Sequence, residues 1–469
     1  MKKKIVCVVP PYYLLIESKN NRIIPSMHYV SQVIYEAGYD VVLINGDAAE
    51  DSFDYADRFS IIMNSWLFDE RYAKGHSSFD KTFEEVIKHN PDVVIISAGD
   101  VLIPTTEFGN CQSCSKLAQM IKEYNPKIIC IGYGNLLKNS KSEHNKYLDA
   151  MIVGEAEDEI LEIIEGKPKG YISCTWVKDL DNLPMLQKDY IETKIKDQDF
   201  DYVMSMRGCG NHCSFCMQPK MRGKNVSRMS VERFKKELKY RIEHYHINNF
   251  YFSDMVFLPQ NDYRKEEMLK MLKKLKSEYG NDFVWRCEQR VDSLSESDMI
   301  NFQEAGCFHI KFGVESLNQK MLDRFHKQTT LEETYGAFEN ANKLGLETTA
   351  YILLGCPGFS DEDYRKMWYE VLALKANNYV VNFNVPYTTT KIYETLKEHL
   401  NQNDLFVDGE EGFIHTSLIM KDYWQISDET LKMYLDLNSQ KDDNKYRLYK
   451  RKVVDSEQYF KNQKIIYNV

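Results

Sequence analysis

The chain has 469 residues and a formal net charge of −10, with 43% apolar and 28% charged residues. Its length exceeds the size at which one hydrophobic core stops growing, so we expect two or three domains. The acidic balance argues against a protein that holds duplex DNA by neutralising phosphates, and we expect no DNA partner. Pro10 and Pro11 interrupt the apolar start, and no apolar run is long enough to span a bilayer. We therefore expect a cytoplasmic protein without a membrane span.

The first part of the chain alternates short apolar strands with helical patterns. Nearly continuous apolar runs are typical of parallel strands that are buried on both faces. Five such runs predict a doubly wound, flavodoxin-like α/β domain over residues 1–170, whose ligands bind beyond the carboxyl ends of the strands. The expected strands are 4–10, 40–46, 92–99, 127–134 and 150–155. Candidate positions near those strand ends are Pro10, Ser97, Gly132, Gly134, Gly154 and Glu155.

A second alternating series follows a polar connecting segment, which we place at residues 171–200. Six strand–helix units predict a partial (β/α)6 barrel over residues 201–395, two units short of a closed barrel. From 396 to 469 the pattern changes to helices rich in aromatic and charged residues, which predicts a small helical domain. The expected barrel strands are 202–206, 249–254, 282–290, 307–316, 346–355 and 379–386.

The stretch RGCGNHCSFCMQPK directly follows the first expected barrel strand, at the end of the barrel where chemistry is found. Its cysteines Cys209, Cys213 and Cys216 have the spacing C-x3-C-x2-C. Three thiolates would leave one iron of a four-iron cluster with an open coordination site. The alternative is a zinc site with a distant fourth ligand such as His212, although zinc motifs usually pair two C-x2-C arms.

This motif resembles that of the radical S-adenosylmethionine (SAM) enzymes, C-x3-C-x-aromatic-C, with Phe215 as the aromatic residue. The resemblance covers residues 202–387 and implies a [4Fe–4S] cluster on the three cysteines, with SAM bound to the open iron. It implies that an electron from a donor such as flavodoxin or ferredoxin then releases a 5′-deoxyadenosyl radical. The SAM contacts that it implies are Ser253 and Asp254 for the amino group, Arg290 for the carboxylate, Glu315 and Ser316 for the ribose, and Gly355 near adenine.

The first domain is similar to the cobalamin-binding domain of the cobalamin-dependent radical SAM enzymes. The matching landmarks include VPP at 9–11, PDVVIISAG at 91–99, KIICIGYG at 127–134 and VGEAEDEI at 153–160. In that family such loops line the corrin, which implies cobalamin contacts at the strand-end positions named above. The chain has no D-x-H-x-x-G, so no histidine ligand to cobalt is indicated. A domain that kept the fold and lost the cofactor is the alternative.

The family resemblance also implies the reaction. Members commonly use one SAM to methylate cobalamin and a second to make the radical, so we expect a methyltransferase acting on an unactivated carbon of a small metabolite or peptide. A non-methylating rearrangement or cyclisation enzyme remains open, as does a non-catalytic iron–sulfur or cobalamin sensor. A methylthiotransferase with a second triad at Cys7, Cys111 and Cys114 is disfavoured by the flavodoxin-like loops. No residue that acts on the substrate is indicated.

Overall fold

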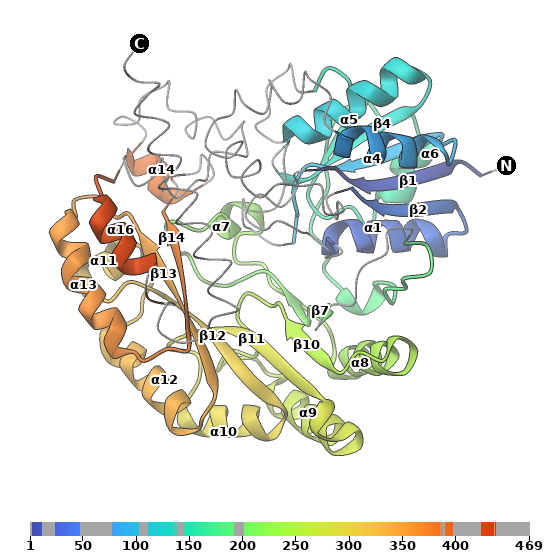
Figure 1. Ribbon diagram of the computed structural model, residues 1–469. Helices are drawn as coiled ribbons and strands as arrows, with labels where there is room; N and C mark the ends of the chain where they lie inside the picture. Colours follow the sequence, from blue (N-terminus) through green and yellow to red (C-terminus); the bar gives the residue numbers. More distant parts are fainter. Residues whose placement is uncertain are drawn as a thin grey trace, which may run out of the picture. The chain divides into compact units, whose positions relative to one another are not determined.

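A computed structural model of the chain describes residues 2–11, 24–46, 77–102, 111–135, 137, 145–191, 201–384, 386, 390–396, 424–435 and 437. The chain forms two compact units (Figure 1). The first unit comprises Met1–Asp199, Cys216–Arg228 and Pro386–His415, and the second comprises Phe200–Phe215, Met229–Val385 and Thr416–Val469. Within the described ranges, no helix is both long and apolar enough to cross a bilayer.

The first unit is built on a six-stranded parallel sheet of order β2-β1-β3-β4-β5-β6. The order of the first five strands is that of the flavodoxin-like fold, which confirms the predicted fold class. Helix α1 packs with α6, and α4 packs with α5, as expected for a doubly wound sheet. The elements are β1 (Lys4–Val9), α1 (Pro25–Glu36), β2 (Asp40–Asn45), α4 (Ser77–Ile87), β3 (Val93–Ser97), α5 (Cys111–Tyr124), β4 (Ile129–Tyr133), β5 (Ala150–Val153), α6 (Ile160–Glu165) and β6 (Gly170–Ser173).

Strand β6 lies at the edge of this sheet, where the sequence predicts the start of a connecting segment. It pairs in parallel with β5, from Ala150↔Gly170 to Val153↔Ser173. Its residues are exposed or half-buried, so the strand carries no apolar run that would mark it in the sequence. A short 3-10 helix, η2 (Leu180–Asn182), follows in the same unit. The remaining elements of this unit are α7 (Gln218–Met221), β9 (Ser227–Arg228) and α14 (Lys391–Leu396).

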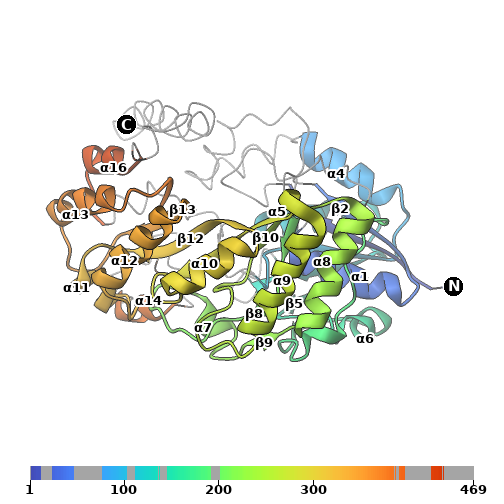
Figure 2. The same cartoon turned by 90° about the horizontal axis from the view of Figure 1, so that it is seen from below.

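The second unit is built on a parallel sheet of six strands in the order β14-β13-β12-β11-β10-β7. Strand order follows chain order from one edge to the other, which is the arrangement expected of a partial barrel. Helices α8 to α13 lie along one side of the curved sheet (Figures 1 and 2). The strands are β7 (Asp201–Val203), β10 (Asn249–Phe252), β11 (Val284–Arg290), β12 (Cys307–Glu315), β13 (Glu347–Leu354) and β14 (Asn378–Phe383), and β8 (Met206–Arg207) is separate.

Sequence punctuation explains where the helices of this unit begin. Ser295, Thr330 and Ser360 each form a reciprocal capping box with an acidic residue three positions later. Ser230 caps α8 through its side chain, which accepts a hydrogen bond from the backbone N–H of Arg233. The helices are α8 (Val231–Tyr245), α9 (Lys265–Tyr279), α10 (Glu296–Glu304), α11 (Gln319–Arg324), α12 (Leu331–Lys343), α13 (Asp361–Ala373) and α16 (Asp428–Leu435), with a 3-10 turn η3 (Gly280–Asp282).

The central strands of the second sheet have two unlike faces. Trp285, Cys287, Ile310 and Phe312 belong to one face and are almost completely buried. Residues of the opposite alternation are polar and half-buried, among them Arg286, Glu288, Lys311 and Tyr351. Parallel strands covered on both sides are normally apolar throughout. The second face therefore has the composition of a binding surface.

The C-terminal segment 424–437 is anchored on the ends of β13 and β14. The indole N–H of Trp424 donates to the carbonyl of Asn384 at 2.8 Å, and the amide of Asn384 donates to the carbonyl of Gly355 at 3.0 Å. A Cβ added to Gly355 would lie 2.3 Å from the indole nitrogen. Gly355 is thus required by contact with Trp424 as well as by its φ of +96°. Most of the helical domain predicted at 396–469, including Tyr423, lies outside the described residues.

Two glycines of the first unit offer a matched test of its packing. Gly154 has φ +98°, and an added Cβ would lie 2.1 Å from the carbonyl oxygen of Cys174, whereas Gly170 has φ +68° and open space around its Cβ position. We expect Gly170→Ala to cost about 1 kcal/mol through its backbone conformation alone. Gly154→Ala should cost about 3 kcal/mol or more, because the backbone must also move. Urea unfolding of both variants checks this, and equal losses would contradict it.

Candidate functional site

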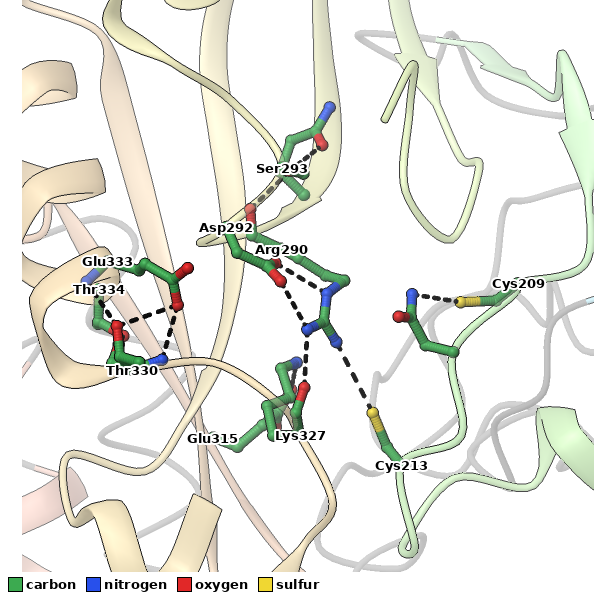
Figure 3. Close-up of polar contacts among 12 residues, drawn as sticks. Cys209, Cys213, Arg290, Asp292, Ser293, Glu315, Lys327, Thr330, Glu333 and Thr334 are labelled. Atoms are coloured by element: carbon green, nitrogen blue, oxygen red, sulfur yellow. Dashed lines mark hydrogen bonds and ion pairs between the residues drawn. The ribbon is translucent and has the colours of Figure 1, made fainter. Parts of the chain in front are cut away.

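The three-cysteine loop begins directly after β7 and β8. Cys209, Cys213 and Cys216 are all half-buried, and none of them forms a disulfide. The side-chain amide of Asn211 donates to Cys209 Sγ at 3.3 Å, and Arg290 Nη1 lies 3.9 Å from Cys213 Sγ (Figure 3). Phe215 packs edge-to-face on Phe325, with 5.4 Å between the ring centroids. The loop thus presents thiols to polar and cationic donors.

Arg290, at the end of β11, is fixed from two other directions. Its Nε and Nη2 atoms donate to the two carboxylate oxygens of Asp292 at 2.8 and 2.9 Å. Nη2 also donates to the backbone carbonyl of Lys327 at 2.7 Å. A bidentate pair of this kind orients a guanidinium strongly. The predicted contact of Arg290 with the SAM carboxylate stays a prediction, and the structure directs its remaining nitrogen towards Cys213.

Two opposing effects act on the Cys213 thiol. Burial raises its pKa, and the positive charges of Lys327 and Arg290 reduce that rise without cancelling it. A metal or cluster takes the thiolate, so nearby cations favour the ligating form. The positively charged surroundings of Cys213 therefore suit a ligand cysteine.

Glu315 ends β12 in an unusual backbone conformation. Its φ is +64°, and the register between β12 and β13 shifts between Gly313 and Glu315. Its carboxylate pairs with Lys327 Nζ at 2.8 Å, and both side chains are largely buried. A left-handed residue at a β-bulge re-aims a side chain, and such features are often found beside binding sites. The predicted ribose contact of Glu315 is untested, and Lys327 is its observed partner.

Asp254 follows β10, and both of its carboxylate oxygens accept hydrogen bonds from residues 205 and 206. It accepts from the N–H of Ser205 at 2.7 Å, the N–H of Met206 at 2.9 Å and the hydroxyl of Ser205 at 2.6 Å. Burial raises its pKa to about 6, against these hydrogen bonds and the charge of Arg264. In this structure Asp254 binds the residues just before the cysteine loop. Its predicted role towards the SAM amino group is untested.

The hydroxyl of Ser253, unlike the carboxylate of the neighbouring Asp254, accepts and donates no hydrogen bond within the described residues, and its oxygen is buried. A buried polar atom without a partner is costly unless a ligand or water satisfies it. Ser253 therefore fits the predicted contact with a bound group. Ser316 does not present its hydroxyl in the same way, because that oxygen contacts the sulfur atoms of Met321 and Met367 at 3.2 and 3.0 Å.

The polar face of the second sheet carries a connected group of ionisable side chains. Tyr251 donates to Glu288 Oε1, and Tyr351 donates to the same oxygen at 3.2 Å. Lys311 Nζ donates to the Tyr251 hydroxyl at 3.2 Å and lies 4.2 Å from the centre of its ring. Burial and the charge of Glu288 raise the pKa of Tyr251. This surface offers both charges and hydroxyls to a polar ligand.

In the first unit, Pro10 and Ser97 lie where strand order reverses. β1 is flanked by β2 and β3, and a flavodoxin-like sheet binds ligands at this switch point. Ser97 ends β3, is completely buried, and has no hydrogen-bond partner for its hydroxyl among the described residues. Ser97 therefore fits a ligand-binding role.

The other predicted positions of this unit have partners within the protein. Cβ atoms at Gly132 and Gly134 would lie within 3 Å of Leu137 and of the Gly99 backbone, respectively. Glu155 pairs with Arg222 Nε at 2.8 Å and accepts from the N–H of Val177 at 3.0 Å, so its carboxylate binds protein groups. The cobalamin contacts predicted for these residues stay predictions.

The cysteines considered for a second triad are core residues. Cys7, Cys111 and Cys114 are almost completely buried, and Cys114 Sγ donates weakly to the carbonyl of Ile96 at 3.7 Å. Burial raises the pKa of Cys7 and Cys114, and Cys111 and Cys130 raise that of Cys114 further, whereas Lys327 and Arg290 partly offset burial at Cys213. Packing accounts for these residues.

Comparison with known proteins identifies the central part of the chain, which includes the cysteine loop. Residues 203–367 match the family model of the radical SAM superfamily. Residues 203–367 are a radical SAM domain. The matched residues begin at the end of β7 and contain the three cysteines, and this family uses a [4Fe–4S] cluster and SAM.

Relatives and solved structures agree with this assignment. An uncharacterized methyltransferase of Pyrococcus horikoshii, PH0819, is 24% identical over 67% of this chain and 72% of its own. The structure of the radical SAM methyltransferase TsrM from Kitasatospora setae, with cobalamin and a [4Fe–4S] cluster bound, has a TM-score of 0.58 and 14% identity, covering 85% of this chain and 78% of that one. The cobalamin-dependent radical enzyme OxsB has a TM-score of 0.56 and 14% identity over 91% of this chain and 62% of its own. These structural likenesses show a shared fold.

The radical SAM cysteines fit a cluster by their chemistry. Among the described residues, no three His, Cys, Asp or Glu side chains converge as they would around a single metal ion. Each thiolate of a four-iron cluster binds a different iron, so these ligands do not have to meet at one point. The three half-buried thiols share one loop, and Arg290 beside Cys213 supplies positive charge.

Several residues of the radical SAM domain were not anticipated from the sequence. Lys327, Asp292 and Arg264 hold Glu315, Arg290 and the base of the cysteine loop. Lys327 lies twelve positions after Glu315 and Arg264 lies far from Ser205 in the sequence, so no local spacing marks either pair. Asp292 is two residues after Arg290, and this local pairing could have been proposed.

The engagement of Asp254 by the cysteine loop predicts a difference between two substitutions. Asp254→Ala leaves two buried N–H groups without an acceptor and should lower the free energy of unfolding by about 2–4 kcal/mol. Asp254→Asn keeps an oxygen for both N–H groups and should lose much less. Urea unfolding at pH 7 of both variants measures this, and equal losses would show that the hydrogen bonds contribute nothing.

The raised pKa of Asp254 sets a pH dependence with a defined sign. Because the folded value of about 6 exceeds the ordinary 3.8, the folded state binds the proton more tightly. This contribution stabilises the wild type fully below about pH 4 and is lost as the pH rises through about 6, a change of about 3 kcal/mol. Asp254→Asn lacks it, so its stability relative to wild type should increase over that range. A constant difference would contradict the shifted pKa.

Proposed function

We propose that the chain is a cobalamin-dependent radical SAM methyltransferase that acts on an unactivated carbon of a small molecule or peptide. The observation that carries the proposal is the three-cysteine loop at the first strand of the radical SAM sheet, in one chain with a flavodoxin-like domain. TsrM and OxsB, whose names or bound ligands include cobalamin, share this fold over most of the chain. When bound, the three cofactors would together supply a carbon radical and a methyl group.

The protein's own residues would hold and orient these groups. Cys209, Cys213 and Cys216 would ligate the cluster, and Arg290 would place a positive charge next to one of its thiolates. The buried hydroxyl of Ser253 would accept or donate a hydrogen bond to SAM, and that of Ser97 to cobalamin. The ion pair of Glu315 with Lys327 would fix the bulged end of β12 beside them.

The polar face of the radical SAM sheet supports a polar substrate. Glu288, Lys311, Tyr251 and Tyr351 provide both charges and hydroxyls on adjacent strands. An apolar hydrocarbon would displace water from these charges and hydroxyls without offering them a hydrogen bond, which costs free energy. An electron donor such as flavodoxin or ferredoxin is required by the reaction class and is part of the proposal.

Product analysis under anoxic reducing conditions tests the assignment. For a methyltransferase, the reconstituted chain with SAM, cobalamin and a substrate should form both 5′-deoxyadenosine and S-adenosylhomocysteine. Cys213→Ala should abolish 5′-deoxyadenosine, because one cluster ligand is lost, whereas Cys307→Ala removes a buried core thiol and should retain it. 5′-Deoxyadenosine alone would indicate a rearrangement enzyme and neither product a sensor. Persistence of 5′-deoxyadenosine in Cys213→Ala would refute the cluster assignment.

Cobalamin binding can be tested separately at Ser97. If its buried hydroxyl binds the cofactor, Ser97→Ala should weaken hydroxocobalamin binding about tenfold, the effect of one lost hydrogen bond. Ser26→Ala removes another buried hydroxyl of the first unit that lacks a described partner, and it should leave binding unchanged. Titration followed by visible absorption measures both. Equal affinities of wild type and Ser97→Ala would remove Ser97 from the site.

A further inference from the structure

The two ends of the cysteine loop meet at one place in the second unit. The backbone N–H of Met229 donates to the carbonyl of Ser205 at 2.9 Å, so the chain leaves and re-enters at the same point. Both residues are almost completely buried. Everything between them, including the three cysteines, extends from this junction. We call Ser205 and Met229 the neck of the loop.

Arg264, just before α9, binds both sides of the neck. Its Nη1 donates to the carbonyl of Ser205 at 3.0 Å and to the carbonyl of Met229 at 2.6 Å. One guanidinium nitrogen thus joins the two backbone segments. No local sequence pattern requires this contact, because Arg264 lies 59 positions from Ser205 and 35 from Met229.

The guanidinium is itself held in place by Asp262. Nε donates to Asp262 Oδ1 at 3.1 Å and Nη2 donates to Oδ2 at 2.8 Å, with both side chains at most 2% exposed. Burying a charged pair is costly unless its geometry is good and the remaining donors are satisfied. Here the remaining nitrogen is satisfied by the neck carbonyls. The pair therefore has a specific backbone target.

Asp254 binds the neck on the donor side. Its carboxylate accepts the N–H groups of Ser205 and Met206, while Arg264 donates to the carbonyl of Ser205. The peptide groups around Ser205 are thus bound by a buried anion through their N–H groups and by a buried cation through a carbonyl. Charge-assisted hydrogen bonds are roughly twice as strong as neutral ones.

We propose that Arg264 is a positioning residue for the cluster loop: it closes the neck and so fixes where Cys209 and Cys213 stand relative to Arg290. The inference rests on the proposed cluster. A loop of this length has many open conformations, and their population falls when its ends are joined. Arginine suits this role because its planar guanidinium has several donors. Nε and Nη2 bind Asp262, and Nη1 binds the carbonyls of Ser205 and Met229.

Iron release from the reconstituted protein tests the proposal. A ferrous chelator removes iron faster when the loop opens, so a change in the release rate reports a change in local opening. Arg264→Met removes the charged hydrogen bonds at the neck and should speed release about tenfold. The same variant should alter the electron paramagnetic resonance spectrum of the reduced cluster, since Arg290 and the thiols lose their fixed relation. Arg264→Lys keeps a charge beside Asp262 and should give an intermediate rate.

Arg233→Met is the matched control. Arg233 is another buried arginine of the same unit, paired with Glu237 at 2.7 Å on α8. Its loss should reduce global stability and leave iron release and the spectrum unchanged. Equal acceleration by the two methionine variants, or wild-type behaviour of Arg264→Met, would overturn the proposal. If Arg264→Met does not fold, an iron-release rate of Arg264→Lys equal to that of the wild type would overturn the proposal. A wild-type chain that takes up no cluster would instead refute the proposed function.

Discussion

The backbone of Ser205 is the point on which the arrangement of the candidate site depends. It is bound by Asp254 through its N–H, and its carbonyl accepts from Arg264 and from the backbone of Met229. A backbone amide does not change with the side chain, so the hold persists whatever residues form the loop beyond it. Two buried charges of opposite sign are used for this one junction. Burying two charges costs free energy, and a fixed position of the loop is the benefit that would offset this cost.

The second constraint is the unlike composition of the two faces of the radical SAM sheet. One face packs aromatic and aliphatic side chains such as Trp285 and Phe312, which make the sheet rigid. The opposite face carries Glu288, Lys311 and Tyr251 in direct contact with one another. Groups attached to neighbouring strands of a rigid sheet need little reorganisation when a ligand arrives. Such preorganisation is what a site that controls a reactive radical requires.

Sequence reasoning located the elements whose signal is local. All six strands of the second sheet were expected, because each is a compact run, and capping residues such as Ser295 and Thr330 mark the starts of helices between them. Strand β6 was not, because an exposed edge strand needs no apolar pattern. The three cysteines were marked by their spacing alone.

The partners of the site residues could not be predicted in the same way. Glu155 was expected beside a cofactor and pairs with Arg222, and Asp254 was expected beside SAM and binds Ser205. Both contacts join segments about 50 or more residues apart, so only the folded chain brings them together. Spacing indicates candidate site residues, whereas long-range packing decides which of them already have partners within the protein.

The contact of Trp424 with Gly355 has a consequence for the order in which the protein matures. The ends of β13 and β14 are completed by an indole that lies 40 positions beyond Asn384. Domains commonly fold as units during synthesis, beginning at the amino terminus. The sheet of the second unit cannot acquire this last contact until the ribosome has released residue 424, so cofactor loading that depends on a finished sheet must wait for the tail.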